Sequence, residues 1–343
     1  MRFQSRVLSV FVLAAVAACA PATAPRGPGP TVPRVTEMSF VTSDGLELAV
    51  RRWLPREGAP KFVVLAVHGF NDYSKAFDKV PDAPGVGPFL ADRGAAVYAY
   101  DQRGFGKSPH FGLWPGRDIM IADYKDFARA LKTMYPDTPL FGLGESMGGA
   151  VVMAALASSD PPPVDGVVLA APAVLGRSTM PLVYRGALWA ATHIVPGWKP
   201  TGQSLGRMAS DNIEMLRDNG RDPLFIKKTR IDAVYGLTGL MDEALDAAPK
   251  IKAPVLYLYG RNDQIIPKKP TKRALGALAK SDAGLRAAYY GNGWHMILRD
   301  KDSALVLEDV AAFLNNPAAA LPSGADVNAL PRLEAAREDC PPC

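Results

Sequence analysis

A serine enclosed by glycines is the first candidate for chemistry in this sequence. Ser146 lies in the stretch FGLGESMGGA (141–150), with Gly144 two residues before it and Gly148 two residues after it. Small residues at these positions allow a turn sharp enough to hold a serine out as a nucleophile, in G-x-S-x-G spacing. The stretch therefore indicates covalent catalysis by Ser146, and an ordinary tight turn is the alternative.

A nucleophilic serine needs a base, and the base needs a carboxylate that orients it. Among the four histidines, His295 is the one that follows the predicted last strand (284–290) and precedes the predicted final helix. Asp263 follows another predicted strand (254–259), and Gly260 allows the turn between them. Asp263 comes between Ser146 and His295 in the chain, whereas two rival carboxylates, Asp300 and Asp302, come after His295. The sequence thus predicts a Ser146, Asp263, His295 triad.

Alternating strands and helices must position these residues. Continuous runs of β-forming residues occur at 62–67, 95–100, 140–143, 164–170 and 254–259, and helical patterns occur at 88–93, 118–135, 147–158 and 268–278. Buried strands that alternate with helices predict a mostly parallel central sheet with helices on both faces, of the α/β class. The hairpin pattern of 34–42 and 46–54 predicts an antiparallel edge. The candidate triad follows the carboxyl ends of strands, where ligands bind in such sheets.

The interval from about 175 to 252 breaks this alternation. It contains no convincing strand, but it has amphipathic helical patterns with apolar residues such as Leu188, Trp189, Ile194, Val195 and Trp198. An insertion of this length between two strands is a cap over the site or a decoration of the fold. We expect a helical cap.

Four further motifs accompany the elbow and give the chain a family resemblance. They are His68-Gly69-Phe70, the turn DQRGFGKS (101–108), the segment GRNDQIIP (260–267) and the loop of His295. With them, residues 34–314 resemble the α/β-hydrolases, within the monoacylglycerol lipase and lysophospholipase-like (serine aminopeptidase S33-like) branch. The departures are minor: Phe70 occupies the oxyanion-loop position, and the cap sequence is not diagnostic.

The resemblance implies a role for each residue. Ser146 would attack an acyl carbonyl, His295 would take and return its proton, and Asp263 would orient the imidazole. Backbone N–H groups of Phe70 and Met147 would form the oxyanion hole. His68 is expected to be structural, and no metal or organic cofactor is implied. The resemblance implies an esterase or lipase acting on small-molecule esters, most of all on monoacyl lipids.

Other functions use the same residues or the same fold. An aminopeptidase needs a cap carboxylate to hold the substrate amine, and Glu214, Asp218 and Glu243 are the candidates. Acyl transfer to an alcohol cannot be separated from hydrolysis by sequence. A catalytically silent envelope-binding lipoprotein is an alternative from a different class.

The first 33 residues predict export and anchoring rather than fold. Residues 1–18 combine two arginines with a short apolar run, as in a secretory signal peptide, and VAAC (16–19) resembles a bacterial lipobox. The resemblance implies cleavage before Cys19 and its lipidation. The Pro/Ala-rich residues 19–33 predict an extended tether. We expect a lipid-anchored protein of the bacterial cell envelope, at the outer membrane facing the periplasm; an ordinary signal peptide is the alternative.

The remaining sequence predicts a hydrolase domain over 34–316 and a polar tail over 317–343. Cys340 and Cys343, the only cysteines besides Cys19, suit a local disulfide or a disordered end. The formal net charge is +5, and the short basic clusters lack interleaved aromatic residues. This pattern argues against a nucleic-acid partner and indicates a solvated basic face, or weak attraction to anionic lipid headgroups.

Overall fold

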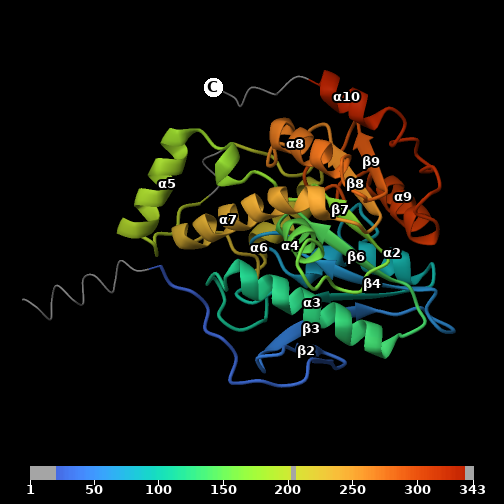
Figure 1. Ribbon diagram of the computed structural model, residues 1–343, viewed down its shortest axis with the longest axis horizontal. Coiled ribbons are helices and arrows are strands. Elements are labelled where there is room, and N and C mark those ends of the chain that lie inside the picture. Colours follow the sequence, from blue (N-terminus) through green and yellow to red (C-terminus); the bar gives the residue numbers. More distant parts are fainter. Residues whose placement is uncertain (1–20, 202–205, 337–343) are drawn as a thin grey trace, which may run out of the picture.

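A computed structural model describes residues 21–201 and 206–336, in which a single sheet is flanked by helices (Figure 1). The strand order is β1-β2-β3-β5-β4-β6-β7-β8-β9. Three strands at one edge are antiparallel, namely β1 (Arg34–Val35), β2 (Ser39–Val41) and β3 (Glu47–Trp53). The other six are mutually parallel: β4 (Phe62–Val67), β5 (Ala95–Tyr100), β6 (Leu140–Glu145), β7 (Gly166–Ala170), β8 (Val255–Gly260) and β9 (Leu285–Tyr290). The predicted α/β architecture with an antiparallel edge is confirmed.

Helices cover both faces of the sheet, which explains why its central strands are continuous apolar runs. Every residue of β4, β5, β6, β7 and β8 is buried. The core on one face is built with α3 (Arg117–Met134), α4 (Met147–Leu156), α7 (Ile231–Ala247), α8 (Lys268–Leu278) and α10 (Ala329–Ala335). The core on the other face is built with α2 (Val86–Ala91) and α9 (Ser303–Asn315), near the short η1 (Ser74–Phe77). Strands buried on both faces are expected to be mostly apolar, and Glu145, the last residue of β6, is the charged exception among these five strands.

The interval between β7 and β8 consists of two parts. Its first part holds η2 (Arg177–Thr179), α5 (Leu182–Ile194) and α6 (Ile213–Arg221), and α5 stands out from the body of the molecule (Figure 1). Its second part is α7, followed by η4 (Ala248–Lys250), and α7 packs against α4 in the layer over the sheet. The predicted boundary of about 175–252 therefore takes in one helix of the sheet layer. We define the cap as residues 175–230.

Residues 21–31 do not form the free spacer that their composition predicts. The Ala22 N–H donates to Asp232 Oδ2 at 3.0 Å, and the Ala24 N–H donates to the Trp114 carbonyl at 2.9 Å. Further along, the Gly27 N–H donates to Asp44 Oδ2 at 2.8 Å. A proline-rich segment cannot build a core of its own, but the backbone N–H groups between its prolines can bind acceptors on a finished domain. We call residues 21–31 the N-terminal strap.

The predicted polar tail is also wrong for residues 317–336. Leu321, Ala325, Ala329 and Leu333 are buried, and α10 packs against β9. The Tyr289 N–H donates to the Ala325 carbonyl, so this segment covers the edge of the sheet. The spacing of these four residues, one in every four, was a signal in the sequence. Cys340 and Cys343 lie outside the described residues, as do Cys19 and the predicted signal peptide.

Candidate active site

The backbone at Ser146 is held in a conformation that side chains rarely adopt. Ser146 lies between β6 and α4 with φ 51° and ψ −114°, and its N–H donates to the Ala170 carbonyl at 2.9 Å. A Cβ atom at Gly144 would approach the Gly148 carbonyl oxygen to 2.6 Å, and one at Gly148 would overlap the Val67 carbonyl. The glycines are thus required by close backbone approach, and the turn is the strained elbow that the sequence predicts.

The structure brings Ser146, Asp263 and His295 into one hydrogen-bonded chain. The His295 Nε2 atom lies 3.0 Å from Ser146 Oγ, and the His295 Nδ1 atom lies 2.9 Å from Asp263 Oδ2. The other carboxylate oxygen of Asp263 accepts from the backbone N–H groups of Ile265 and Ile266 at 2.8 and 2.9 Å. Asp263 is therefore fixed on both sides, and the imidazole can accept the serine proton.

Two loops hold the acid and the base in place. The Asp263 loop follows β8 and the His295 loop follows β9, and the Asn262 N–H donates to the Gly293 carbonyl at 2.9 Å. A Cβ atom at Gly260 would overlap the backbone of Gly293, so the two loops pack in direct contact. This contact sets the distance between Asp263 and His295.

The electrostatics of the site favour a charged His295. Burial opposes the imidazolium, but the Asp263 carboxylate and its hydrogen bond, together with Glu145 and Asp300, outweigh burial. The pKa of His295 is consequently raised above the usual histidine value. The proton taken from Ser146 can thus be held on the imidazole until the leaving group receives it.

The oxyanion side of the site lies between the loop after β4 and the start of α4. A Cβ atom at Gly69 would lie 3.4 Å from the Ser146 Cβ atom, so the loop of Phe70 runs beside the elbow. Met147 is the first residue of α4, where backbone N–H groups have no partner within the helix. The Phe70 ring packs edge-on against Trp114. Both predicted donors thus flank Ser146.

His68 contacts the backbone of this loop through its imidazole ring. It is fully buried, its Nδ1 atom lies 2.8 Å from the Gly69 carbonyl, and its Nε2 atom accepts from the Gln102 N–H at 3.0 Å. Burial lowers the pKa of His68, which keeps the imidazole neutral with one nitrogen donating and one accepting. This geometry agrees with the structural role expected of His68.

Sequence reasoning missed a buried arginine that joins three loops of the site. Arg299 Nη1 lies 2.8 Å from Asp72 Oδ2, and Arg299 Nη2 lies 2.9 Å from Glu145 Oε2. None of the three side chains is more than 5% exposed. Asp72 belongs to the oxyanion loop, Glu145 precedes the nucleophile, and Arg299 follows His295. One guanidinium therefore joins the segments that carry the candidate oxyanion hole, the candidate nucleophile and the candidate base.

Burial and ion pairing shift the pKa values of Glu145 and Arg299 in opposite directions. Burial raises the pKa of Glu145, although Arg299 opposes that rise, and the two carboxylates raise the pKa of Arg299 despite its burial. The charged residue next to Ser146 was a signal in the sequence, because a carboxylate beside a buried elbow requires a partner. Nothing local in the sequence identifies that partner as Arg299.

The carboxylates that an aminopeptidase would need are each bound to an arginine. Glu214 pairs with Arg217, and Asp218 pairs with Arg221, both on the surface of α6. Glu243 lies on α7, outside the cap, and pairs with Arg117 at 3.1 Å. The set proposed from the sequence therefore offers no unpaired carboxylate for a substrate amine.

Comparison with known proteins agrees with this geometry. Residues 58–302 match the model of the family described as "Serine aminopeptidase, S33". The chain is 25% identical to a monoacylglycerol lipase of Mycolicibacterium smegmatis, over 81% of this chain and 96% of that protein. It is 25% identical to the human monoglyceride lipase, over 81% of this chain and 89% of that protein.

Solved structures share the fold. A monoacylglycerol lipase of Paleococcus ferrophilus superposes with a TM-score of 0.61 at 23% identity, covering 80% of this chain and all of that one. A soluble variant of the monoglyceride lipase of Saccharomyces cerevisiae, in complex with a substrate analogue, superposes with a TM-score of 0.62 at 19% identity, covering 86% and 99%. The predicted α/β-hydrolase fold is confirmed.

Proposed function

This chain belongs to the serine aminopeptidase S33 family, and on that premise we propose that it hydrolyses the esters of monoacyl lipids through an acyl-enzyme on Ser146. The observation that carries the proposal is the 3.0 Å contact between Ser146 Oγ and His295 Nε2, with Asp263 behind the imidazole. The contact provides a nucleophile with its base already in reach.

The geometry gives the order of events. Ser146 Oγ attacks the ester carbonyl carbon while its proton passes to His295 Nε2, and the carbonyl oxygen becomes an anion beside the Phe70 and Met147 N–H groups. The proton then goes to the departing alcohol, which leaves an acyl-enzyme. Water, deprotonated by His295, attacks the acyl carbon and releases the acid and Ser146. Each oxyanion-hole donor contributes about 10²–10³ in rate in enzymes of this kind.

Monoacyl lipids are supported by two observations. The relatives reported above are named for this substrate class, and the cap exposes large apolar side chains toward solvent. On α5 and just after it these include Leu182, Val183, Tyr184, Trp189, Ile194, Val195 and Trp198. Exposed apolar side chains gathered on one element mark a surface that meets lipid or a partner.

Fluorophosphonate labelling and a substrate panel test the proposal. We expect the probe to label wild-type protein and not Ser146→Ala, and we expect mono-oleoylglycerol or lysophospholipid to be hydrolysed faster than aminoacyl amides. Failure to label wild-type protein would leave the silent lipoprotein as the better interpretation. A preference for the amides would favour an aminopeptidase. Ester products recovered when an alcohol is added would measure acyl transfer.

Membrane attachment at Cys19 is a second part of the proposal. The lipobox-like VAAC supports it, and so does the path of the strap, whose Ala22 binds Asp232 while the Asp232 N–H donates to the Pro196 carbonyl of the cap. Cys19 is two residues from Pro21, a reach of about 7 Å at most. A lipid on Cys19 would bring the exposed apolar side chains of α5 toward a membrane of the bacterial envelope. We propose that this is the outer membrane.

Fractionation of expressing bacteria tests the anchor. We expect wild-type protein in the outer-membrane fraction, with mass spectrometry showing an acylated Cys19, and Cys19→Ala in the soluble fraction with unchanged activity on a soluble ester. Wild-type protein in the soluble periplasm would contradict the anchor. None of the helices in the described parts of the chain is long and apolar enough to cross a bilayer.

A further inference from the structure

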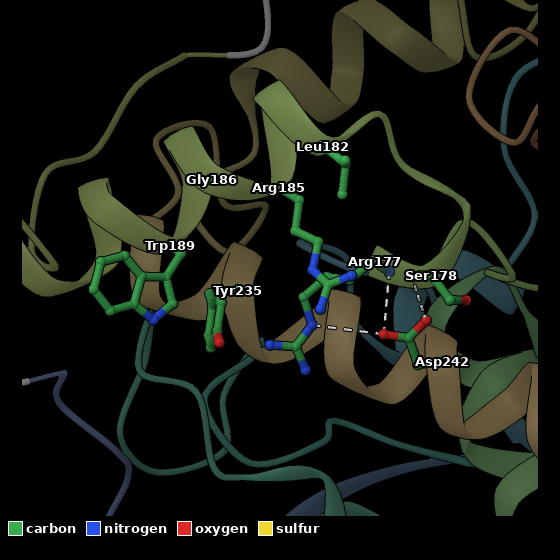
Figure 2. A pocket seen from close by; sticks show the side chains of 8 residues that line it. All are labelled: Arg177, Ser178, Leu182, Arg185, Gly186, Trp189, Tyr235 and Asp242. Carbon is green, nitrogen blue, oxygen red and sulfur yellow. Dashed lines mark hydrogen bonds and ion pairs between the residues drawn. The ribbon is translucent and has the colours of Figure 1, made fainter.

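A cavity of about 610 Å³ lies between the cap helix α5 and α7, and it contains none of the candidate triad. Figure 2 shows it from close by. Its size falls within the range of small-molecule sites. The lining side chains come from η2, α5 and α7, and they are Arg177, Ser178, Leu182, Arg185, Trp189, Tyr235 and Asp242, with Gly186 at the α5 wall. We call it the cap cavity.

Positive charge exceeds negative charge in the cap cavity. Arg177 and Arg185 both extend into the space between α5 and α7 (Figure 2), and Asp242 is the only carboxylate in the lining. Asp242 is already engaged, because it accepts from the N–H groups of Arg177 and Ser178 at 3.1 and 2.9 Å. Its Oδ2 atom also lies 3.5 Å from Arg177 Nε. Within the described residues, no carboxylate is left to balance Arg185.

The sequence around the cavity adds to this imbalance. Between 171 and 210 there is no Asp or Glu, while Arg177, Arg185, Lys199 and Arg207 all fall in this range. Two guanidinium groups facing one cavity repel each other unless an anion lies between them. An Arg fork binds a carboxylate or phosphate through paired hydrogen bonds, so a bound oxyanion is the group that would complete the site.

Leu182, Trp189 and Tyr235 form the apolar and aromatic part of the lining. Leu182 and Trp189 are 79% and 56% exposed, and the Arg177 guanidinium lies over the Tyr235 ring at 4.4 Å from its centre. The Trp189 ring also lies against the His193 ring at a tilt of 32°, and the His193 Nδ1–H donates to the Trp189 carbonyl. An apolar wall next to two cations suits a ligand that has an anionic head and a hydrocarbon chain.

We propose that the cap cavity binds the oxyanionic head of an acyl amphiphile, a carboxylate or a phosphate, with the acyl chain lying along Leu182 and Trp189. The proposal rests on the proposed function for the source of the ligand, since an esterase of monoacyl lipids meets fatty acids as products and phospholipids as surroundings. Binding itself needs no turnover, so it can be tested on a chain that cannot react.

The test is titration calorimetry on the full chain carrying Ser146→Ala, with each lipid below its aggregation concentration. The probes are oleate, 1-oleoyl lysophosphatidate and inorganic phosphate, with mono-oleoylglycerol as the uncharged lipid whose binding Arg185→Gln should not change. We expect one or both anionic lipids to bind, and Arg185→Gln to weaken that binding at least about tenfold, as expected for loss of a charge-assisted hydrogen bond. Arg273→Gln, which removes an exposed arginine on α8, should change nothing.

The probes separate the possible sources of the ligand. If Arg185→Gln weakens the binding of oleate alone, the ligand is a fatty-acid carboxylate. If it weakens the binding of lysophosphatidate alone, the ligand is a phosphate headgroup. Either result supports the site. Trp189→Ala should weaken the same lipid and leave inorganic phosphate unaffected. The proposal is overturned if Arg185→Gln leaves both anionic lipids unchanged, or if inorganic phosphate binds as tightly as lysophosphatidate. Labelling of wild-type Ser146 by a fluorophosphonate decides the proposed function separately.

Discussion

The catalytic floor and the cap differ in how their charged and apolar groups are satisfied. We define the catalytic floor as the loops 68–72, 145–147, 263–266 and 295–299. Its charged side chains are buried and paired, as in Arg299 with Asp72 and Glu145. In the cap, Val183 is 80% exposed and Trp198 is 60% exposed, and Arg185 lines the cap cavity. The charges of this cluster in the floor are paired within the chain, whereas the cap presents groups that a ligand or a lipid surface would cover.

Substitutions in the floor should therefore cost more than substitutions in the cap. Removing one partner in the floor leaves a buried group without its counterpart, so both activity and stability should suffer. Removing a side chain of the cap leaves the folded chain nearly unchanged and should affect only lipid substrates.

Ser146→Ala should have the largest effect on activity. Loss of the nucleophile lowers kcat by about 10⁶ in serine hydrolases of comparable mechanism. Stability should stay close to wild type, because alanine keeps the backbone and leaves no buried charge. Initial rates with a p-nitrophenyl ester, together with a thermal melt, measure both. Residual activity near wild type would remove Ser146 from the mechanism.

Arg299→Met should damage stability and activity together. Methionine fills similar space but leaves Asp72 and Glu145 buried without a cation, which costs about 3–5 kcal/mol. Urea denaturation measures the free energy of unfolding. Arg217→Met is the matched control, since its ion pair with Glu214 is on the surface and such pairs are worth about 0–1 kcal/mol. Equal losses of unfolding free energy in the two variants would show that the buried cluster contributes no more to stability than the surface pair.

The pH dependence should report the charges around His295. Catalysis needs the neutral imidazole, and the raised pKa of His295 means that it stays protonated to higher pH than an ordinary histidine. The acid limb of kcat/KM should therefore have its midpoint above about 6.5, the usual histidine pKa.

Glu145→Gln sharpens this prediction. Glu145 is one of the carboxylates that raise the pKa of His295, so its neutralisation should move the acid limb to lower pH. Arg299 then keeps only Asp72 as a partner, which shifts the limb in the same direction. A limb that stays in place while kcat falls would give Glu145 a purely structural role.

The cap should show the smallest and most selective effect. Val183 and Ile194 lie eleven residues apart on one face of α5 and are 80% and 66% exposed. The double variant Val183→Ser, Ile194→Ser should raise KM for dispersed mono-oleoylglycerol about 3–10-fold, from lost apolar contact with lipid. Rates with p-nitrophenyl acetate should not change. Leu305→Ser, at an exposed site on α9, is the control.

The elbow and the alternation of strands and helices were predictable because each leaves a short-range pattern in the sequence. A side chain at Gly144 or Gly148 would overlap backbone atoms a few residues away or on the next strand. The runs of β4 and β8 are apolar because helices cover both faces of the sheet. The cap boundary was less predictable. The pattern of α7 shows an amphipathic helix, but only its contact with α4 places it over the sheet.

The strap and the C-terminal segment were misjudged for a related reason. Composition indicates whether a segment can build its own core, and residues 21–31 cannot. It does not indicate whether the folded domain has hydrogen-bond acceptors, such as Asp44 and Asp232, along the path of the segment. For residues 317–336 the spacing of buried residues was present, but the edge of β9 that they cover exists only after folding.

Short-range pattern and chain order were enough to predict Ser146 as the nucleophile, the order Ser146, Asp263, His295, and the fold that carries them. Only the folded chain shows that Arg299 joins Asp72 to Glu145, that the strap lies against the domain, and that Arg177 and Arg185 face one cavity. These contacts join residues far apart in the chain. Their energies depend on burial and on which charges meet, and neither quantity is set until the sheet has formed.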